Sequence, residues 1–572
     1  MKEKLEVKAP WYSSYNGLRK HLDYPNHGIY ENLKASCERY PNNIALNYFG
    51  NKTSYRRLLQ KIDECARSLK VLGMKTGDKV TICMPNTPEA IIAFYAINKI
   101  GAIANVIHPL SAENEIKHAL NLSKSKMIIS IDLAWEKLEK VLPKSKVKNT
   151  VIVSVMDSMP IILGLGYYVT QGKNVKMPSY GENVMTWKDF ISKSSLYSEQ
   201  TFEDVKGQDD AVILYSGGTT GTSKGIILTN LNFNAVAIQC YEACVNLKAG
   251  MSVLSILPIF HGFGLGICIH TVLSYGLTSI ILPTFSAKTF DKLLKKYKPN
   301  AIIGVPTLYE ALLLNKNMRN EDLSYIKCAI SGGDTISPSL KRKIDSFFKE
   351  HNCDVQIREG YGLTECVAAS CLMPVNEYKE GSIGIPIPDM YFKIVKPGTI
   401  DEVPYDEEGE IVISGPTVMK GYLDNKEETK ETLRKHKDGR VWLHTGDLGR
   451  MDKKGYVYFS QRLKRMIVSS GYNLYPNRIE SVIEELPFVL KSCVIGIAHP
   501  YKVEVAKAFV VLKDDVEANE AIRNEIYDHC VKNLAKYSLP YEIEFREHLP
   551  KTKVNKIDYR KLEEQEKNKK KK

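Results

Sequence analysis

The sequence predicts an α/β protein with a large N-terminal domain of mixed sheets flanked by helices, a small barrel-like β region and a small α+β C-terminal domain. Three observations support this prediction. Strand-like and helical segments alternate in the first part of the chain, short strands and turns follow from about residue 380, and mixed helix and strand return beyond Arg462. A chain of 572 residues is too long for a single hydrophobic core, so at least two domains are expected.

The alternation in the N-terminal part has the spacing of strands joined by crossover helices. Leu58, Ile62, Ala66 and Leu69 fall on one face of a helix that begins near Thr53. Strand, helix and strand in this order predict a parallel sheet. The expected strands cover residues 42–48, 79–84, 103–107, 126–131, 252–257, 278–282, 301–305 and 326–331, and further helices begin at Thr87 and cover 113–121.

The rest of the chain falls into two parts with different patterns of secondary structure. Short strands separated by proline, glycine and aspartate, at 391–395, 409–414 and 456–459, predict a mostly antiparallel region. The last part is the size of one small domain. Its expected elements are helices over 479–485 and 520–536 and strands over 489–497, 506–512 and 543–545. We therefore expect domains over residues 1–461 and 462–572, with a solvated basic tail over 566–572.

Composition narrows the cellular setting. The formal net charge of +13 suggests anionic partners, but no zinc-finger spacing or arginine-rich arm points to nucleic acid. Twelve cysteines without a C-x-x-C pair predict neither a zinc site nor a disulfide framework, and the N-terminus lacks a secretory signal, so a cytoplasmic location fits best. Polar residues interrupt the uncharged run 265–282, and we expect a buried helix and a strand joined at Gly276 rather than a membrane span.

An apolar insert follows residue 157. Residues 159–173 read M-P-I-I-L-G-L-G-Y-Y-V-T-Q-G-K, and Lys176 comes shortly after. One interpretation is an interfacial patch that gives peripheral membrane contact and admits a lipid substrate. The other is a loop or helix packed on the protein body. Buried apolar segments outnumber membrane-touching ones, which favours the second interpretation.

A loop rich in glycine and hydroxyl groups lies at residues 215–225, Y-S-G-G-T-T-G-T-S-K-G, between two apolar runs. Glycines let backbone N–H groups approach an anion, the hydroxyls add donors and Lys224 adds a positive charge, so the loop suits phosphate. The lysine precedes a glycine, whereas the Walker loop has Gly-Lys followed by Ser or Thr. Taken alone, the segment is equally typical of a flexible surface turn.

Five further motifs decide between these readings. In order along the chain they are Y-G-L-T-E at 361–365, H-T-G-D at 444–447, R-L-K at 462–464, G-Y-N at 471–473, and L-P-K-T at 549–552 leading to Lys556. With the phosphate loop, this ordered set resembles the signature of the adenylate-forming superfamily, which includes acyl-CoA synthetases, luciferases and adenylation domains of nonribosomal peptide synthetases. The resemblance extends from about residue 25 to 562. It implies the adenylate-forming enzyme fold with a mobile C-terminal domain.

The resemblance implies an ATP site. The β- and γ-phosphates would lie in the loop, Mg²⁺ on Glu365 and Thr220, the α-phosphate near Thr364, and the adenine ring on Tyr361. Asp447 would accept from both ribose hydroxyls, with Arg462 as a donor to the same sugar. The implied ATP and AMP ligands are Ser216, Gly217, Gly218, Thr219, Thr220, Gly221, Lys224, Gly332, Gly333, Asp334, Glu359, Gly360, Tyr361, Gly362, Thr364, Asp447 and Arg462.

The same resemblance implies the chemistry. A carboxylate is a poor electrophile, so such an enzyme forms an acyl adenylate, expels pyrophosphate and then lets a thiol displace AMP. Lys556 would stabilise the forming adenylate, and the implied catalytic residues are Lys556, Thr364, Glu365 and His261. For the second step the small domain would rotate about a hinge at Lys464 and present Gly471, Tyr472 and Asn473 to coenzyme A. Taken singly, Tyr361, Asp447 and Lys556 also fit a core residue, a turn residue and a solvated lysine.

The chain departs from the family pattern at four positions. Asn555 stands where a glycine usually precedes the catalytic lysine, and asparagine tolerates left-handed backbone. Ser223 replaces a frequent proline, Gln461 an acidic residue or glycine, and Val503 a glycine. None of these changes removes a charged group that the chemistry requires.

Residue types near the substrate favour a fatty acid. His261 stands where amino-acid-activating relatives carry an aspartate, so an α-ammonium group would find no carboxylate. Small and apolar residues leave room for an apolar tail, with an acyl pocket at His261, Val305, Gly333 and Gly362. An aromatic acid is the second choice. Coenzyme A is the expected acceptor because no carrier domain follows Lys556, and a separate acyl carrier protein is the alternative.

Three hypotheses therefore stand: a fatty acyl-CoA ligase using ATP, Mg²⁺ and coenzyme A; an enzyme that loads aryl or acyl groups onto a carrier protein; and a catalytically silent nucleotide or lipid binder. Retention of Lys224, Glu365, Asp447, Arg462 and Lys556 speaks against the silent binder. We expect no obligate protein partner.

Overall fold

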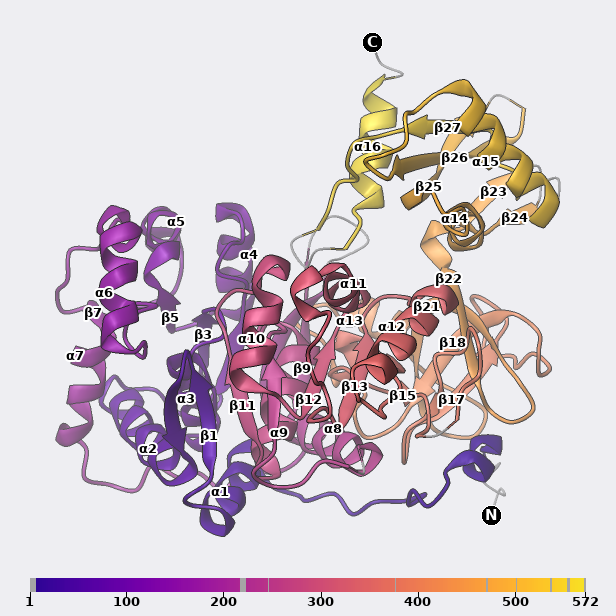
Figure 1. Ribbon diagram of the computed structural model, residues 1–572. Helices are drawn as coiled ribbons and strands as arrows, with labels where there is room; N and C mark the ends of the chain where they lie inside the picture. Colours follow the sequence, from indigo (N-terminus) through magenta and orange to yellow (C-terminus); the bar gives the residue numbers. More distant parts are fainter. Residues whose placement is uncertain are drawn as a thin grey trace, which may run out of the picture.

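The computed structural model consists of a large N-terminal body and a smaller C-terminal domain above one side of it (Figure 1). The structure describes residues 7–216, 223–244, 246–375, 377–469, 472–499, 501–534, 538–552 and 556–569. Two large sheets and a small antiparallel sheet form the body, and the C-terminal domain has a sheet of its own. This arrangement is the α/β fold predicted from the sequence.

The first large sheet has eight strands. Its central strands pair in parallel, and β8 and β9 form an antiparallel hairpin at Ser216 and Lys224. The phosphate loop therefore connects two neighbouring strands at the sheet edge. In spatial order the strands are β19 (Gly421–Tyr422), β9 (Lys224–Thr229), β8 (Asp210–Ser216), β4 (Ile103–Val106), β3 (Lys79–Cys83), β5 (Met127–Ile131), β6 (Asn149–Val153) and β7 (Val184–Thr186).

The second large sheet has nine strands and supplies the Y-G-L-T-E motif. Six of its strands run parallel to a neighbour, and short antiparallel strands close both ends. In spatial order they are β16 (Ile385–Pro386), β15 (Cys371–Leu372), β14 (Arg358–Tyr361), β13 (Cys328–Gly332), β12 (Ala301–Gly304), β10 (Ser252–Ser255), β11 (Thr278–Ile281), β1 (Ile44–Tyr48) and β2 (Asn51–Ser54).

Helices cover these sheets and fill the space inside the body. All residues of α3 are buried, as expected of a helix that is mostly apolar. The body helices are α1 (Ile29–Arg39), α2 (Tyr55–Val71), α3 (Pro88–Lys99), α4 (Glu113–Ser123), α5 (Trp135–Val141), α6 (Ile161–Thr170), α7 (Trp187–Ser192), α8 (Asn230–Ala243), α9 (Val272–Ser274), α10 (Phe290–Tyr297), α11 (Pro306–Leu314), α12 (Pro338–Glu350) and α13 (Lys426–Thr432).

The small sheet of the body is antiparallel, as the sequence predicted. In spatial order its strands are β17 (Tyr391–Val395), β18 (Gly409–Ser414), β21 (Val441–Met451) and β20 (Leu433–Lys435), and β22 (Val457–Arg462) also pairs with β21. The C-terminal domain has its own apolar clusters. Its elements are β23 (Ile467–Ser469), β24 (Tyr472–Leu474), α14 (Pro476–Glu484), β25 (Val489–His499), β26 (Val503–Leu512), α15 (Glu520–Asn533), β27 (Glu542–Phe545) and α16 (Tyr559–Lys569).

An N-terminal segment ties the small sheet to the rest of the body. Trp11 is fully buried, 6.3 Å from the Tyr391 ring, and Tyr15 donates to the Pro386 carbonyl at 2.9 Å. The Asp389 carboxylate accepts from the Leu22 amide and the Tyr24 hydroxyl, both at 2.8 Å. Residues before α1 thus run along the body to the region below β17 (Figure 1).

Most expected elements appear, with shifts at their ends. The strand expected from residue 326 begins at Cys328, and the helix expected from 479 begins at Pro476, where a proline at the first position costs no hydrogen bond. The run 265–282 forms a buried helix and β11 joined at Gly276, as predicted, although most of the helix, Phe263–Thr271, has π geometry. In the described part of the chain, no helix combines the length and apolarity needed to cross a membrane.

Candidate active site

Asp447 is the buried centre of the candidate site. It lies on β21 directly opposite Arg462 on β22, and Arg462 Nε is 3.4 Å from Asp447 Oδ1. The Tyr361 hydroxyl donates to Asp447 Oδ2 at 2.7 Å. The aspartate is only 2% exposed, and its Oδ1 accepts no hydrogen bond from any described group. Burial raises the pKa of Asp447, so this unsatisfied carboxylate oxygen is prepared to accept from a hydroxyl ligand.

The turn before Asp447 is fixed by buried side chains. Glu410 accepts from the Gly446 amide at 3.1 Å, and its other oxygen lies 2.9 Å from His444 Nδ1. The Thr445 hydroxyl accepts from the Asp447 amide at 3.0 Å. These contacts explain why the H-T-G-D sequence places the aspartate rigidly beside Tyr361.

The 3-10 helix Thr364–Cys366 holds the second acidic group, Glu365. The Tyr422 hydroxyl donates to Glu365 Oε1 at 3.0 Å, and the Met419 amide donates to the Glu365 carbonyl at 2.8 Å. Thr364 is buried beside it. Among the described residues, no group of three His, Cys, Asp or Glu side chains could hold a metal ion alone. Glu365 would thus need further oxygen ligands from a phosphate-bearing substrate, which is how proteins usually hold Mg²⁺.

Close backbone approach explains two glycines of the motifs. The Ala368 amide donates to the Cys366 carbonyl at 2.7 Å across Val367, whose φ of +64° is strained for a β-branched residue. A Cβ on Gly262 would lie 1.5 Å from the Val367 carbonyl oxygen, and a Cβ on Gly362 would lie 1.4 Å from the Ala368 carbonyl oxygen. Only glycine fits at either position. Gly262 and Gly362 are therefore both packed against the backbone of the turn at Val367 and Ala368.

The phosphate loop is described at its two ends. Ser216 ends β8 and Lys224 begins β9, opposite each other in the hairpin register. The Lys224 ammonium group forms an ion pair with Glu428 and lies 5.1 Å from the centre of the Tyr422 ring. His118 on α4 lies 3.1 Å from the Ser223 carbonyl. Outside the described residues lie Gly217, Gly218, Thr219, Thr220 and Gly221.

Lys556 brings the C-terminal domain into the site. Burial lowers the pKa of Lys556; the positive charge of Arg462 acts in the same direction, and the negative charges of Asp334 and Asp447 oppose it. Burial together with the Lys556 charge lowers the pKa of His261 to about 4. The Lys556 charge therefore interacts electrostatically with residues on four segments of the body. Asn555, the unusual residue before Lys556, lies outside the described residues.

Backbone hydrogen bonds shape the loop that carries Lys556. The Thr552 amide donates to the Lys556 carbonyl at 2.6 Å, and the Thr552 hydroxyl accepts from the Lys556 amide at 3.2 Å. Lys551 and Ile557 form a β-bridge at its base. The L-P-K-T sequence thus closes a narrow loop with the lysine at its end.

The expected adenine and acyl residues lie at the ends of neighbouring strands. Gly332 on β13 pairs with Gly360 on β14, and a Cβ on Gly332 would lie 3.3 Å from the Phe263 ring. Gly333 has a φ of +79°, and Val305 Cγ1 lies 3.7 Å from the position of a Cβ on it. Val305 and Gly333 therefore lie together, as an acyl pocket requires, and Phe263 joins them.

Two acidic residues at this edge differ in environment. Glu359 is buried, and burial raises its pKa to about 8, with Lys341 opposing the shift. Asp334 is exposed and its Oδ1 accepts from the Thr335 amide at 2.9 Å. Neither arrangement by itself identifies a ligand.

The expected hinge and thiol-channel residues lie at the start of the C-terminal domain. Lys464 is in the 3-10 helix Leu463–Arg465, directly after β22. Tyr472 and Asn473 pair with Ser469 and Val468 across β23 and β24. Gly471 lies outside the described residues, and the side chains of the other three predicted residues are not described.

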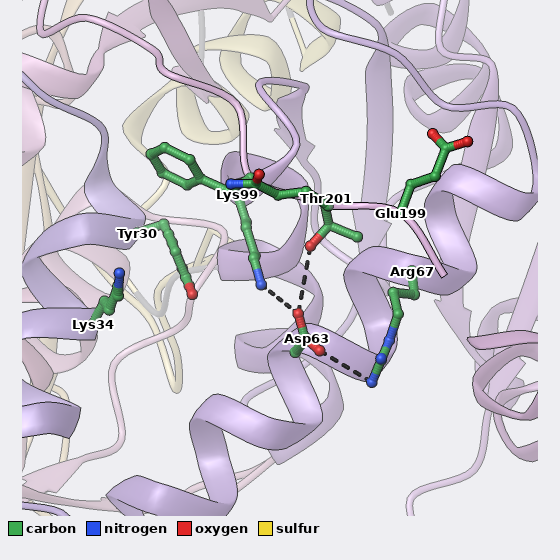
Figure 2. A pocket seen from close by; sticks show the side chains of 9 residues that line it. Tyr30, Lys34, Asp63, Arg67, Lys99, Glu199 and Thr201 are labelled. Carbon is green, nitrogen blue, oxygen red and sulfur yellow. Dashed lines mark hydrogen bonds and ion pairs between the residues drawn. The ribbon is translucent and has the colours of Figure 1, made fainter. Parts of the chain in front are cut away.

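A cavity of about 280 Å³ lies apart from this site, between the first helices of the body and residues 199–202 (Figure 2). Asp63 at its wall pairs with Lys99 at 2.5 Å and Arg67 at 3.0 Å, and accepts from Thr201 at 3.4 Å. None of the predicted site residues lines it. Three of its charged side chains, Asp63, Arg67 and Lys99, are paired with one another, so we assign it a structural role in fixing residues 199–202.

Sequence reasoning missed Tyr422 and Glu428. Both lie on a segment without a recognised motif, and only the pairing of β19 with β9 brings them next to Lys224. The G-Y pair at 421–422 carries no spacing that could have predicted the contact. These two residues link the phosphate-loop lysine to Glu365.

Comparison with known proteins agrees with the family resemblance found in the sequence motifs. The family model described as AMP-binding enzyme matches residues 33–423, and the model described as AMP-binding enzyme C-terminal domain matches residues 478–556. A relative from Bacillus subtilis (strain 168), named long-chain-fatty-acid–CoA ligase, is 34% identical over 570 residues, covering 98% of this chain and 99% of the relative. A protein of the same name from Haemophilus influenzae is 32% identical, covering 97% and 98%.

Solved structures agree in fold. ATP-bound MatB from Rhodopseudomonas palustris aligns with a TM-score of 0.81 at 24% identity, covering 94% of this chain and 99% of that one. The Mycobacterium tuberculosis fatty acyl CoA synthetase aligns with a TM-score of 0.67 at 25% identity, covering 94% and 98%.

Proposed function

The chain belongs to the AMP-binding enzyme family, and on this premise we infer that it is an AMP-forming acid–thiol ligase acting on fatty acids. It activates the carboxylic acid with ATP, releases pyrophosphate, and transfers the acyl group to coenzyme A to give acyl-CoA and AMP. The full-length similarity to two fatty-acid–CoA ligases supports this function. The observation that supports it is the electrostatic interaction of Lys556, a residue of the C-terminal domain, with Asp447, Arg462 and His261: the charges of Asp447 and Arg462 act on the pKa of Lys556, and the Lys556 charge lowers the pKa of His261.

For the first step we assign each group by its chemistry. Asp447 Oδ1, buried and without a hydrogen bond, would accept from a ribose hydroxyl, while Tyr361 keeps the other oxygen in place. Lys224 and the phosphate loop would hold the departing pyrophosphate. Lys556 would stabilise negative charge on the oxygen that bridges the acyl group and phosphorus. Glu365 fits a magnesium site, and the ion would supply charge neutralisation for the phosphates.

For the second step, the C-terminal domain must move. We propose that a thiol reaches the adenylate from the side that Lys556 would occupy, so that Lys556 would have to leave after pyrophosphate does. We place the division between the two domains at Arg462, where β22 ends, and the hinge at Lys464 in the short helix that follows. A rotation there would withdraw Lys556 and bring β23 and β24, with Tyr472 and Asn473, toward the site.

The acid is proposed to be of medium or long chain. Val305, Gly333 and Phe263 offer an apolar surface, and His261 stays neutral at physiological pH because its pKa is about 4. Neither feature suits the ammonium group of an amino acid. An aromatic acid, and a carrier protein as acceptor, remain the second candidate because anthranilate and benzoate CoA ligases share the fold.

Assays on the purified chain separate the hypotheses. Pyrophosphate release is measured across saturated acids of increasing length and across benzoates, and thioester formation is then measured with coenzyme A and with an acyl carrier protein. We expect release with fatty acids and thioester on coenzyme A. Release only with benzoates, or thioester only on the carrier, would favour the second candidate, and no release with any acid would leave the silent binder.

Helix α6 supports peripheral membrane contact. It carries the apolar insert, and its side chains are open to solvent: Ile161 is 82% exposed, Ile162 84%, Leu165 62% and Val169 63%. The expectation that the insert packs on the body is therefore wrong for these residues. Helix α6 lies at the end of the body remote from the C-terminal domain (Figure 1). Apolar side chains in such number on one exposed helix are typical of an interfacial helix.

A basic residue next to α6 favours an anionic lipid surface. Lys173 follows the helix and is exposed, and no ion pair joins it to a described residue. Lysines near a membrane surface each add to the attraction of anionic headgroups. We propose that this face binds the bilayer in which fatty acids dissolve.

Replacing Ile161, Ile162 and Leu165 together by serine should weaken binding to vesicles of phosphatidylglycerol and phosphatidylcholine at least a hundredfold, because each apolar side chain contributes about 1.5–3 kcal/mol on burial. Sedimentation with vesicles measures the partition coefficient. The matched control is Leu196→Ser, a 74% exposed leucine outside α6. Equal binding of the triple variant and the control would contradict membrane contact through α6, whereas turnover of a detergent-dispersed acid should be unaffected in both.

A further inference from the structure

The short segment that runs from β19 into α13 contacts both of the charged groups that are assigned to the phosphates, Lys224 and Glu365. Strand β19 pairs antiparallel with β9, which places Tyr422 opposite Ile226. The Tyr422 ring lies 5.1 Å from the Lys224 ammonium group, and its hydroxyl donates to Glu365 at 3.0 Å. Glu428, in the first turn of α13, forms an ion pair with the same ammonium group.

Local hydrogen bonds fix Glu428 in this position. Asn425 caps α13 and accepts from the Glu428 amide at 3.1 Å. The Thr429 hydroxyl donates to the Asn425 carbonyl at 2.7 Å and accepts from the Tyr422 amide at 2.9 Å. The strand and the helix that carry the two partners of Lys224 are therefore joined rigidly. The Lys224 side chain is only 15% exposed and the Glu428 side chain 31%, so this ion pair is partly shielded from water.

A carboxylate in this position competes with phosphate for the ammonium group. A shielded cation is costly without a partner, and Glu428 supplies that partner whenever no phosphate is present. A triphosphate or pyrophosphate that engages Lys224 has to displace Glu428 or accept its negative charge nearby. Each bound state of the phosphates is thus weakened by the charge-assisted hydrogen bond that Glu428 would otherwise make.

We propose that Glu428 is a counter-ion that competes with the polyphosphate for Lys224, and that it promotes release of pyrophosphate after the adenylate has formed. The proposal rests on the assignment of Lys224 to the leaving pyrophosphate. As pyrophosphate departs, Lys224 returns to Glu428, which keeps the cation from retaining the product. No covalent bond changes in this exchange, because one ion pair replaces another.

Calorimetric titration of the full chain with magnesium pyrophosphate, without acid or coenzyme A, tests the competition directly. Glu428→Gln keeps the size of the side chain and removes its charge. It should tighten pyrophosphate binding roughly tenfold, since the charge-assisted bond no longer competes. Glu427→Gln, on the same helix and exposed, should bind like the original protein. Glu428→Ala should behave like Glu428→Gln, and guards against an effect of the amide itself.

A second variant pair checks that the effect passes through Lys224. Once Lys224→Met has removed the ammonium group, adding Glu428→Gln should change pyrophosphate binding less than twofold. In steady state, Glu428→Gln should also lower the inhibition constant of pyrophosphate by the same factor as in calorimetry. Equal binding by Glu428→Gln and Glu427→Gln, or weaker binding by Glu428→Gln, would overturn the proposal.

The outcomes are distinct from a failure of the proposed function. Absence of acid-dependent pyrophosphate release in the original protein would refute the ligase assignment, while calorimetry would still report the competition. Normal turnover with unchanged pyrophosphate affinity in Glu428→Gln would refute only the role of Glu428. Undiminished pyrophosphate binding by Lys224→Met would also refute it, because the ammonium group would then not be a phosphate ligand.

Discussion

Lys556→Ala is expected to slow acyl-adenylate formation by roughly a hundred- to a thousandfold, the usual effect of removing a group that stabilises developing negative charge. The same variant should convert a supplied acyl adenylate and coenzyme A to acyl-CoA at close to the original rate, because the lysine serves only one orientation of the C-terminal domain. Single-turnover pyrophosphate release measures the first step, and thioester formation from synthetic acyl-AMP measures the second.

The matched control for this variant is Lys551→Ala. Lys551 is exposed on the same loop. Its replacement by alanine removes the same charge from the same domain. It should leave both steps unchanged. Equal losses in the two steps for Lys556→Ala would contradict the account with two domain orientations.

The pH dependence of adenylation provides a second readout of Lys556. Only the protonated amine carries the charge, and burial lowers its pKa from the ordinary value of 10.5. The rate of adenylation should therefore be full below the folded-state pKa of Lys556 and decline as pH rises through it, at a lower pH than for an exposed lysine. The thioester step should lack this decline when acyl-AMP is supplied.

Asp447→Asn is expected to raise the dissociation constant of ATP about a hundredfold. The replacement keeps the shape but removes the charge, so the acceptor for ribose hydroxyls becomes neutral and Arg462 loses its counter-ion. A hydrogen bond to a charged group contributes about 1.5–3 kcal/mol, and two such bonds are at stake. Calorimetric titration with ATP in the absence of acid measures the effect.

Asp406→Asn is the control for the charge change. Asp406 pairs with Arg450 of β21 on the surface of the same sheet, and its φ of +68° suits asparagine. It should bind ATP normally. If Asp447→Asn lowered only the melting temperature and left ATP affinity unchanged, Asp447 would be a structural residue of the turn and not a ribose ligand.

The parallel sheets were predictable because their strands are buried on both faces and appear as short apolar runs. Strands β3, β4, β5 and β12 lie close to their expected ranges. The two-residue strands β15, β16 and β19 were not predictable. Two residues carry no periodicity, and such short strands form only where a neighbouring strand has a free edge. The N-terminal segment was missed for a related reason. Trp11 packs against Gly455, more than four hundred residues away in the sequence.

For the site, spacing predicted the residue types better than their contacts. Tyr361, Asp447 and Arg462 were expected near one nucleotide, and the structure brings them together. That Tyr361 donates to Asp447 could not be read from the motifs, because it depends on how β14 faces β21. The partners of Lys224 could not be predicted either. Glu428 belongs to a short charged helix, and such a sequence is typical of a solvent-exposed helix. Roles of the loop residues 217–222 stay predictions.

The most direct test of the central claim follows a carboxylate oxygen. A fatty acid labelled with ¹⁸O in its carboxylate is incubated with the protein, ATP, Mg²⁺ and coenzyme A, and the ¹⁸O content of each product is measured by mass spectrometry. If an acyl adenylate forms and a thiol displaces AMP, one ¹⁸O atom must appear in AMP, pyrophosphate must be unlabelled, and acyl-CoA must keep the other oxygen. Label in inorganic phosphate together with ADP, or AMP without label, would contradict adenylate formation by this enzyme.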